Sequence, residues 1–179
     1  GGVSCSLSLQ RLAAERGITL HITLIENKEF AGERHYNQCV GVLSPPIANL
    51  IENQLGLSFP FHLNRQLIEG YVLHAGNEQI LLQEAGEHSF SLRRVQFDDY
   101  MLAAVKQLGI QVLPSRAVDL EFFHDHVVVY TESEPVKGEV VIGAWGTDDG
   151  SSAIFHRVTG YQAPKHLYSI VTKFHPGAE

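Results

Sequence analysis

Apolar side chains recur at helical spacing in three stretches of the chain, and each stretch ends at a glycine. The stretches are residues 6–16, 47–55 and 95–108, which precede Gly17, Gly56 and Gly109. An apolar stripe with a period near 3.6 residues predicts an amphipathic helix. A glycine directly after it suits the left-handed cap that ends many helices. We therefore predict three main helices, and a shorter fourth one over residues 151–158.

Short apolar, β-branched runs alternate with these helices. Residues 19–25, 110–113 and 139–142 are apolar enough to be covered on both faces, which is typical of strands in a parallel sheet. Residues 117–123 and 126–132 read as a hairpin around His124 and Asp125. We expect this hairpin to form a small β-meander on one face of the sheet.

The stretch between the second and third helices has a different character. Residues 66–74, 79–83 and 88–92 predict three short strands of an antiparallel sheet, separated by glycine-bearing turns. Residues 167–174 alternate as one further strand. Strands that alternate with helices predict an α/β fold, so the fold class is Rossmann-like: a parallel sheet with helices on one face and a β-meander on the other, plus part of an antiparallel sheet.

Composition narrows the class of protein. The chain has 179 residues, 44% of them hydrophobic, and a formal net charge of -7 with scattered Lys and Arg. This argues against a nucleic-acid-binding surface, which needs a basic patch. No apolar run approaches the ~20 residues that span a bilayer, and two cysteines do not make a disulfide scaffold. We expect free thiols and a cytoplasmic location.

The first 26 residues carry the clearest candidate chemistry. Gly1 and Gly2 open a short run before the first helix, and Glu26 ends the first predicted strand. Glycine lets the backbone approach a phosphate closely, and a helix N-terminus favours negative charge. A carboxylate about 20 residues further on can accept hydrogen bonds from a ribose. The order predicts a dinucleotide site, although Cys5 or Ser6 stands where a third glycine is usual.

The later motifs resemble those of FAD-dependent oxidoreductases of the geranylgeranyl reductase and aromatic hydroxylase superfamily. Five stretches carry the resemblance in order along the chain. They are the Gly1–Cys5 run, Glu26-Asn27-Lys28, the run Cys39-Val-Gly-Val-Leu-Ser-Pro45, and the pair Arg94-x-x-Phe-Asp and Gly143-Ala-Trp-Gly146. The resemblance covers nearly all residues but only the front half of such enzymes, so we expect a partial chain that lacks the first strand of the sheet.

The resemblance implies roles for individual residues. The backbone of Gly1, Gly2 and Ser4 would face the FAD pyrophosphate, and Glu26, with Asn27, would hold the adenosine ribose. Arg34 would reach phosphate or ribose, Cys39 would lie near the flavin ring, and Arg94 would meet the pyrophosphate. Val118 would pair through its backbone with adenine, and Ala144 and Gly146 would shape a turn beside the pyrophosphate. Residues 1–58 and 93–157 would form the FAD-binding domain, and 59–92 and 158–179 part of a substrate domain.

Several alternatives stay open at this stage. Arg94 has a second interpretation as a salt bridge to Asp98 at helical spacing, and Cys39 as a small buried hydrophobe. His124 and His126 flank the tip of a predicted hairpin, and this position favours solvated turn residues over a metal site. No catalytic residue is assigned. Trp145 replaces the aspartate that the resemblance leads one to expect.

The functional hypotheses follow from this comparison. The leading one is a reductase of isoprenoid double bonds that uses FAD, with NAD(P)H as a candidate electron donor and an apolar small molecule as substrate; association with a membrane surface is compatible with such a substrate. The alternatives are an FAD-dependent monooxygenase, a non-catalytic dinucleotide-type domain and an NAD-binding dehydrogenase domain. The antiparallel insert over residues 66–92 argues against the last.

Overall fold

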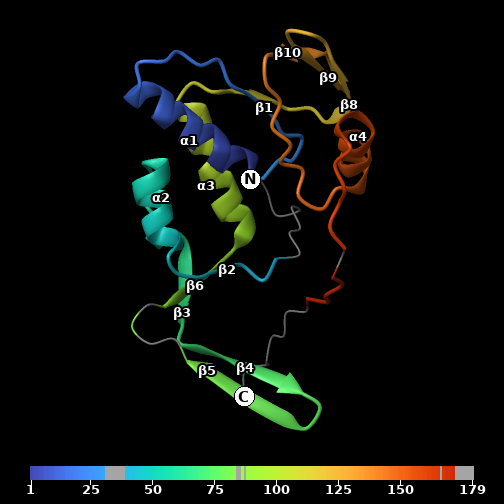
Figure 1. Cartoon of the computed structure of the whole chain (residues 1–179). Helices are drawn as coiled ribbons and strands as arrows, with labels where there is room; N and C mark the ends of the chain where they lie inside the picture. The colour runs from blue at the N-terminus through green and yellow to red at the C-terminus, as the bar shows by residue number, and fades with distance from the viewer. Residues whose placement is uncertain (31–38, 84–85, 87, 166, 172–179) are drawn as a thin grey trace. The chain divides into compact units, whose positions relative to one another are not determined.

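The computed structural model describes residues 1–30, 39–83, 86, 88–165 and 167–171 (Figure 1). Its contacts divide the chain into two compact units. The first joins Gly1–Glu29 to Ala103–Tyr168, and the second contains Phe30–Leu102 and the segment from Ser169 onward. Helix α3 (Arg94–Gln107) runs from the second unit into the first. The functional division expected from the sequence, with an FAD-binding domain over residues 1–58 and 93–157 and part of a substrate domain over the rest, stays a prediction.

The first unit is built on a short parallel pair of strands. Strand β1 (Thr23–Ile25) pairs with β7 (Gln111–Leu113), with Thr23 opposite Gln111 and Ile25 opposite Leu113. Successive side chains of a strand point to opposite faces. Leu24 therefore faces α1 (Gly2–Glu15), while Ile25 packs against the buried cluster of the meander. This arrangement confirms the predicted layers, although β1 is shorter than the predicted strand 19–25.

The predicted meander is present and has three strands. Strands β8 (Ala117–Phe122), β9 (Val127–Thr131) and β10 (Val136–Gly138) pair antiparallel in the order β10-β9-β8. Helix α4 (Asp149–Thr159) lies along β8 (Figure 1). Its apolar side chains cover a cluster of Leu120, Val127 and Val129. The unit thus has a second core, formed between α4 and the meander.

The strand predicted over residues 139–142 is wrong. These residues have no strand assignment, and Val140 is 79% and Ile142 53% exposed. A β-branched run forms a strand only where a neighbouring strand accepts its hydrogen bonds. Among the described residues the parallel sheet contains β1 and β7 alone. The strand that forms in this part of the chain is β10, which directly precedes residue 139 and pairs with β9. The sequence pattern did not predict β10.

The second unit contains two antiparallel sheets and α2 (Ile47–Leu55), whose bounds agree with the prediction. Strands β2 (Val42–Leu43), β6 (Ser89–Leu92) and β3 (Asn64–Ile68) form one sheet, after the short helix η1 (Phe61–Leu63). Strands β4 (Gly70–Ala75) and β5 (Glu78–Gln83) form a separate two-stranded ribbon. The single strand predicted over residues 66–74 is therefore two strands, interrupted at Glu69.

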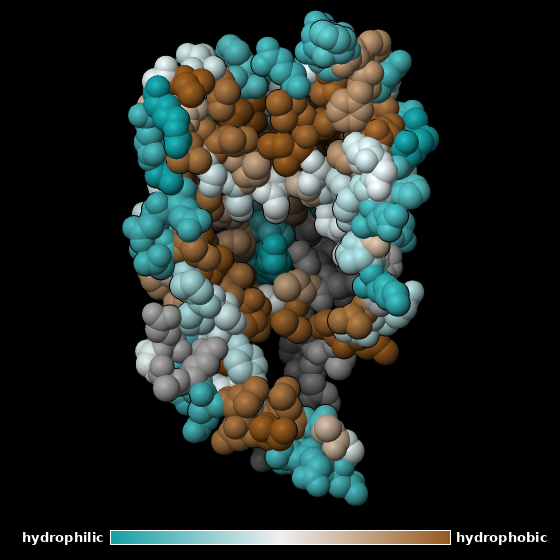
Figure 2. Space-filling model, viewed as in Figure 1, coloured by the Kyte–Doolittle hydropathy of each residue, from teal (hydrophilic) through white to brown (hydrophobic). Residues whose placement is uncertain are grey.

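The ribbon carries apolar side chains on both faces. Val72, Leu73, Ile80 and Leu81 are each at least half exposed, and Figure 2 shows apolar side chains gathered over this part of the chain. A two-stranded ribbon alone is marginally stable in water. The further strand predicted over 167–174 is not formed by the described residues 167–171, of which Leu167, Tyr168 and Ile170 are almost fully exposed.

The helix ends follow the sequence closely. Gly17, Gly56 and Gly109 all have positive φ. After α1, the N–H groups of Gly17 and Ile18 donate to Ala14 and Ala13, which is a Schellman motif. In α3, Phe97, Met101, Ala104 and Val105 are buried as predicted, whereas Leu108 is 50% exposed because it falls in the closing turn.

Helix α4 offers a first test of these local rules. The Asp148 carboxylate accepts a 2.7 Å hydrogen bond from the Ser151 N–H and a 3.1 Å contact from Arg116. We expect Asp148→Ala to lower the free energy of unfolding by about 1 kcal/mol, the usual effect of removing an N-cap. The hydrogen bonds from Ser151 and the charge of Arg116 lower the pKa of Asp148. A depressed folded-state pKa means that the contribution is present at neutral pH and is lost as pH falls through that pKa. Urea unfolding of both proteins across acidic pH would check this, and a difference that grows on acidification would contradict it.

Candidate functional site

The glycine run at the start of the chain is the first turn of α1 and not a separate turn before it. Gly1 is the N-cap, and the Cys5 N–H donates to the Gly1 carbonyl at 3.0 Å. The helix thus begins four residues before the predicted start at Ser6. In an α-helix, the N–H groups of the first turn, here Gly2, Val3 and Ser4, have no intrahelical acceptor. They are the backbone donors that an anion at a helix N-terminus would use.

The two glycines allow this helix end to approach its neighbours closely. A Cβ atom on Gly1 would lie 3.4 Å from the Cβ of Ala144, and one on Gly2 would lie 3.1 Å from Cδ1 of Leu24. Larger side chains would push α1 away from β1 and from the segment around Ala144. Gly1, Gly2, Ser4 and Ala144, which the sequence assigned to one site, are therefore brought together.

Glu26 lies at the carboxyl end of β1, where parallel sheets of this class bind ligands. Its N–H donates to the Leu113 carbonyl at 3.1 Å, and its Oε1 accepts a 2.9 Å hydrogen bond from the Lys28 N–H. The second bond holds the carboxylate across the turn that contains the exposed Asn27. Within the described ranges no hydrogen bond to the other carboxylate oxygen, Oε2, is present.

A buried hydroxyl that sequence reasoning missed lies next to the carboxyl end of β7. Ser115 is 4% exposed, and its Oγ has no hydrogen-bond partner among the described residues. A buried polar atom without a partner is uncommon and calls for an explanation. The signal in the sequence was the pair Pro114-Ser115 directly after a buried strand. Ser115 follows Leu113, the residue whose carbonyl binds the Glu26 N–H, so the orphaned hydroxyl fits a ligand at this end of the sheet.

Val118 occupies an irregular position of the meander. Ala117 lies opposite Thr131, and Asp119 lies opposite Tyr130, so Val118 is an extra residue in β8. A bulge leaves the extra residue outside the regular ladder of hydrogen bonds. The backbone of Val118 is therefore suited to an external partner, as the expected contact with adenine requires.

Trp145, which stands where an aspartate was expected, makes packing contacts through its ring. Its ring lies over Gly143, where a Cβ would be only 1.8 Å from Cζ3. The indole also contacts Phe155 at a centroid distance of 4.3 Å and Tyr161 at 5.5 Å. The residue thus anchors α4 to the segment before it. Gly146, which follows, has a φ of +67° and forms the expected turn.

Two of the predicted site residues, Cys39 and Arg94, belong to the second unit. The Gly41 N–H donates to the Cys39 sulfur at 3.4 Å, and Arg94 Nε donates to Asp98 Oδ1 at 2.7 Å. Burial lowers the pKa of Arg94, but the hydrogen bond and charge of Asp98, together with the neighbouring Cys39, outweigh it and raise the pKa. The salt bridge between Arg94 and Asp98, which was the second interpretation of Arg94, is therefore present. A contact between Arg94 and a phosphate stays a proposal. Arg34 lies outside the described residues.

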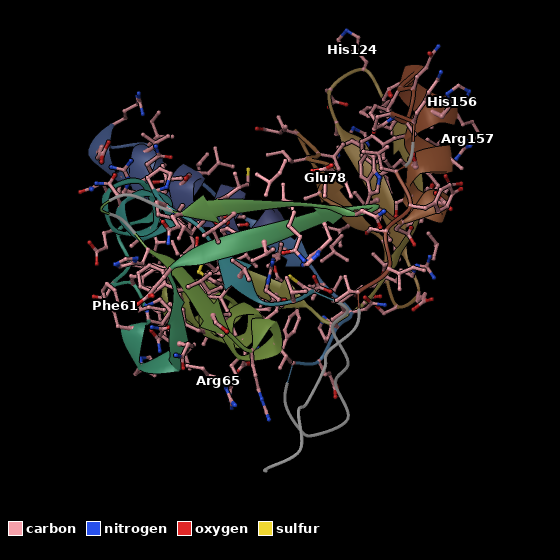
Figure 3. All side chains as sticks on the ribbon, turned by 90° about the horizontal axis from the view of Figure 1, so that it is seen from below. Phe61, Arg65, Glu78, His124, His156 and Arg157 are labelled. Atoms are coloured by element: carbon pink, nitrogen blue, oxygen red, sulfur yellow. The ribbon has the colours of Figure 1, made fainter. Side chains whose placement is uncertain are left out.

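The remaining candidates, His124 and His126, lie at the β8–β9 hairpin. His124 points away from the tip of the β8–β9 hairpin (Figure 3), while His126 stacks on Phe123 at 4.5 Å and binds Asp125. Neither Cys5 nor Cys39 forms a disulfide bond within the described part of the chain. Within the described ranges, no group of three or more His, Cys, Asp or Glu residues is arranged to hold a metal ion, and no helix there is long and apolar enough to cross a membrane.

The parallel strands, the close-packed helix N-terminus and the acid at the strand end define a Rossmann-like domain of the dinucleotide-binding class. Comparisons with solved structures specify the class further. The chain is similar to a geranylgeranyl bacteriochlorophyll reductase-like protein from Thermoplasma acidophilum, with 25% identity, a TM-score of 0.52, and 76% of this chain matched to 34% of that one. It is also similar to a flavoprotein/dehydrogenase from Cytophaga hutchinsonii, with 16% identity, a TM-score of 0.61 and coverages of 93% and 42%.

A third similar structure is the halogenase PltM in complex with phloroglucinol and FAD, with 17% identity, a TM-score of 0.54 and coverages of 77% and 31%. No protein-family model matches the sequence, and no curated protein matches it. The chain spans between about a third and two fifths of these solved chains. The chain has the fold of the FAD-dependent oxidoreductase and monooxygenase superfamily, which confirms the resemblance in the sequence.

Proposed function

We propose that this chain is the ADP-binding part of an FAD-dependent oxidoreductase. The observation that carries the proposal is the carboxyl end of the β1–β7 pair, where Glu26 and the unpartnered buried Ser115 hydroxyl follow adjacent strands. The N–H groups of Gly2 and Ser4 would hold the pyrophosphate. Glu26 would bind the ribose through Oε2, and Val118 would bind adenine. When bound, FAD supplies the hydride chemistry, and the protein binds it, orients it and excludes water.

Within this class we propose a reductase of isoprenoid double bonds, with NAD(P)H as electron donor. The Cys39–Pro45 run and the likeness to a geranylgeranyl bacteriochlorophyll reductase-like protein support this branch. The apolar faces of the β4–β5 ribbon are compatible with an apolar substrate. The formal net charge of -7 disfavours a nucleic-acid partner.

A monooxygenase is the second candidate, since a halogenase that binds FAD has the same fold over 77% of this chain. A non-catalytic domain is the third. Trp145 favours it, because an indole packed on Phe155 cannot accept the hydrogen bonds that a carboxylate would. Measurements on the purified protein separate these candidates.

We expect the protein to bind FAD, and we expect ADP but not FMN to displace it, because the proposed site would contact the ADP end of the cofactor. The chain has one tryptophan, Trp145, next to Ala144 and thus close to Gly1. Bound flavin should therefore quench its fluorescence. Titration with FAD, followed by competition with ADP, FMN and NAD⁺, checks this. If added FAD leaves the tryptophan fluorescence unchanged and the protein stays colourless, the chain does not bind FAD. If FMN competes and ADP does not, the protein contacts the flavin end of FAD and not the ADP end.

The branch is decided by the reaction of the reduced flavin. A reductase should form a saturated product from a prenyl substrate without oxygen, whereas a monooxygenase should require oxygen and form a hydroxylated product. Anaerobic and aerobic turnover of the same prenyl alcohol, analysed by mass spectrometry, distinguishes the two.

A further inference from the structure

Glu26 and Ser115 are held close together at the carboxyl end of the β1–β7 pair. The Leu113 carbonyl accepts the Glu26 N–H at 3.1 Å and the Ser115 N–H at 2.9 Å. Both backbone nitrogens therefore lie within hydrogen-bond distance of a single oxygen atom. The bond from Ser115 closes a tight turn around Pro114, whose ring fixes its φ angle. The two residues thus reach the end of the parallel pair at fixed, neighbouring positions.

The polar atoms of these two side chains suit a ligand with two adjacent hydroxyl groups. One carboxylate oxygen of Glu26, Oε1, already accepts the Lys28 N–H at 2.9 Å. Glu26 is therefore not placed to receive both hydroxyls of a diol through two unoccupied oxygens, and a second polar group is needed. Ser115 Oγ is buried without a partner among the described residues. As a hydroxyl it both donates and accepts, so it can bond to another hydroxyl in either direction.

Only the side chain of Ser115 has to move for a ligand to reach it. The Oγ atom is enclosed, so contact requires a rotation about χ1. This rotation breaks no hydrogen bond to a described residue, and a buried hydroxyl that gains a partner no longer carries the cost of being unpaired. The backbone is held on both sides, because Leu113 accepts the Ser115 N–H and the Arg116 carbonyl accepts the Glu132 N–H at 3.0 Å.

The order of the residues along the chain relates them to the two hydroxyls of an adenosine ribose. Val118, the extra residue of β8, is the proposed contact for adenine and follows Ser115 by three residues. The ribose 2′-hydroxyl is on the carbon next to the one that carries the base, and the 3′-hydroxyl is one carbon further away. Ser115 is therefore the partner suited to the 2′-hydroxyl, and Glu26, on the other strand, is suited to the 3′-hydroxyl.

We propose that Ser115 binds the 2′-hydroxyl of the adenosine ribose, while Glu26 binds the 3′-hydroxyl through Oε2. This inference rests on the proposed function, the binding of the ADP part of FAD. It adds a specificity to that function, because a ligand without the 2′-hydroxyl leaves Ser115 buried and unpaired. The site then distinguishes a ribonucleotide from its 2′-deoxy analogue through a residue outside the glycine run and the strand-end acid.

Calorimetric titration with ADP, 2′-deoxy-ADP and 3′-deoxy-ADP tests this assignment. Wild type should bind 2′-deoxy-ADP about 2- to 10-fold more weakly than ADP, the usual range for one neutral hydrogen bond. Ser115→Ala should weaken the binding of ADP and of 3′-deoxy-ADP by that factor. It should leave the affinity for 2′-deoxy-ADP unchanged, because that ligand already lacks the partner hydroxyl. Ser133→Ala is the control, since Ser133 is exposed in the β9–β10 turn and bonds to Thr131, and it should keep wild-type affinity for all three.

The outcomes separate this contact from the proposed function. If Ser115→Ala weakens ADP and 2′-deoxy-ADP equally, or weakens neither, Ser115 does not bind the 2′-hydroxyl, while the binding of FAD by this chain stands. If wild type binds neither ADP nor FAD, the proposed function is wrong and the contact is wrong with it.

Thermal unfolding provides a second test that a structural role for Ser115 would not pass. A buried hydroxyl without a partner lowers stability, so ligand-free Ser115→Ala should melt at the wild-type temperature or above it. Saturating ADP should then raise the melting temperature of wild type by more than that of Ser115→Ala, because it binds wild type more tightly. A lower melting temperature for ligand-free Ser115→Ala would mean that the hydroxyl is bonded within the protein, and would overturn the proposal.

Discussion

Replacing Gly41 with alanine should destabilise the protein by about 3 kcal/mol or more, the combined cost of a left-handed alanine and of overpacking. Gly41 has a φ of +80°, and a Cβ there would lie 1.9 Å from the Leu92 carbonyl oxygen. The Leu92 N–H in turn donates to the Gly41 carbonyl at 2.9 Å. The clash is with backbone, so it cannot be relieved by a rotamer change. Relief requires β6 to move away and this hydrogen bond to break.

Thermal or urea unfolding of Gly76→Ala provides the matched control. Gly76 also has a positive φ, +62°, but no atom lies within 4 Å of its hypothetical Cβ. Gly76→Ala therefore carries the conformational cost without the clash. We expect the melting temperature of Gly41→Ala to fall by roughly 6–12 °C, and clearly more than that of Gly76→Ala. Equal shifts would mean that the close approach of Gly41 to Leu92 is absent in solution.

Local signals predicted the helix ends well, and long-range pairing accounts for most of what they missed. Gly56 and Gly109 terminate α2 and α3 as expected, because a residue with positive φ is needed within one turn of the end. The failure at residues 139–142 has a different origin. Apolar β-branched residues indicate that a strand can form, but its partner is chosen by tertiary structure.

The start of α1 shows the same limit at a functional position. Glycine is unfavourable in a helix by roughly 1 kcal/mol, so local propensity placed the start at Ser6. In the structure, helix α1 begins at Gly2. Its first turn packs against Leu24 and Ala144, where a larger residue does not fit. The candidate site was found from the order of motifs, while the orphaned Ser115 hydroxyl became visible only once burial was known.

Trp145 illustrates what sequence comparison can and cannot explain. The comparison showed that an expected aspartate is absent, but gave no reason. In the structure the indole fills the space between Gly143 and Phe155. The position of Trp145 is thus set by packing.

Glu26→Ala should weaken FAD binding by roughly 10- to 150-fold, the equivalent of about 1.5–3 kcal/mol for a hydrogen bond to a charged group. The Glu26 Oε1 accepts a hydrogen bond from the Lys28 N–H at 2.9 Å, so Oε2 is the atom that we propose for the ribose contact. Flavin titration followed by tryptophan fluorescence would give the dissociation constants.

Two further variants separate the ribose contact from other effects of the substitution. Glu29→Ala removes the same charge from an exposed position three residues further on and should leave FAD affinity unchanged. Glu26→Gln keeps an oxygen for the Lys28 N–H but replaces the second oxygen by a donor, so its affinity should lie between those of wild type and Glu26→Ala. If Glu29→Ala weakens FAD binding as much as Glu26→Ala does, the effect is one of net charge, and Glu26 has no specific place in the site. If Glu26→Gln matches wild type, the carboxylate acts only by closing the turn at Lys28.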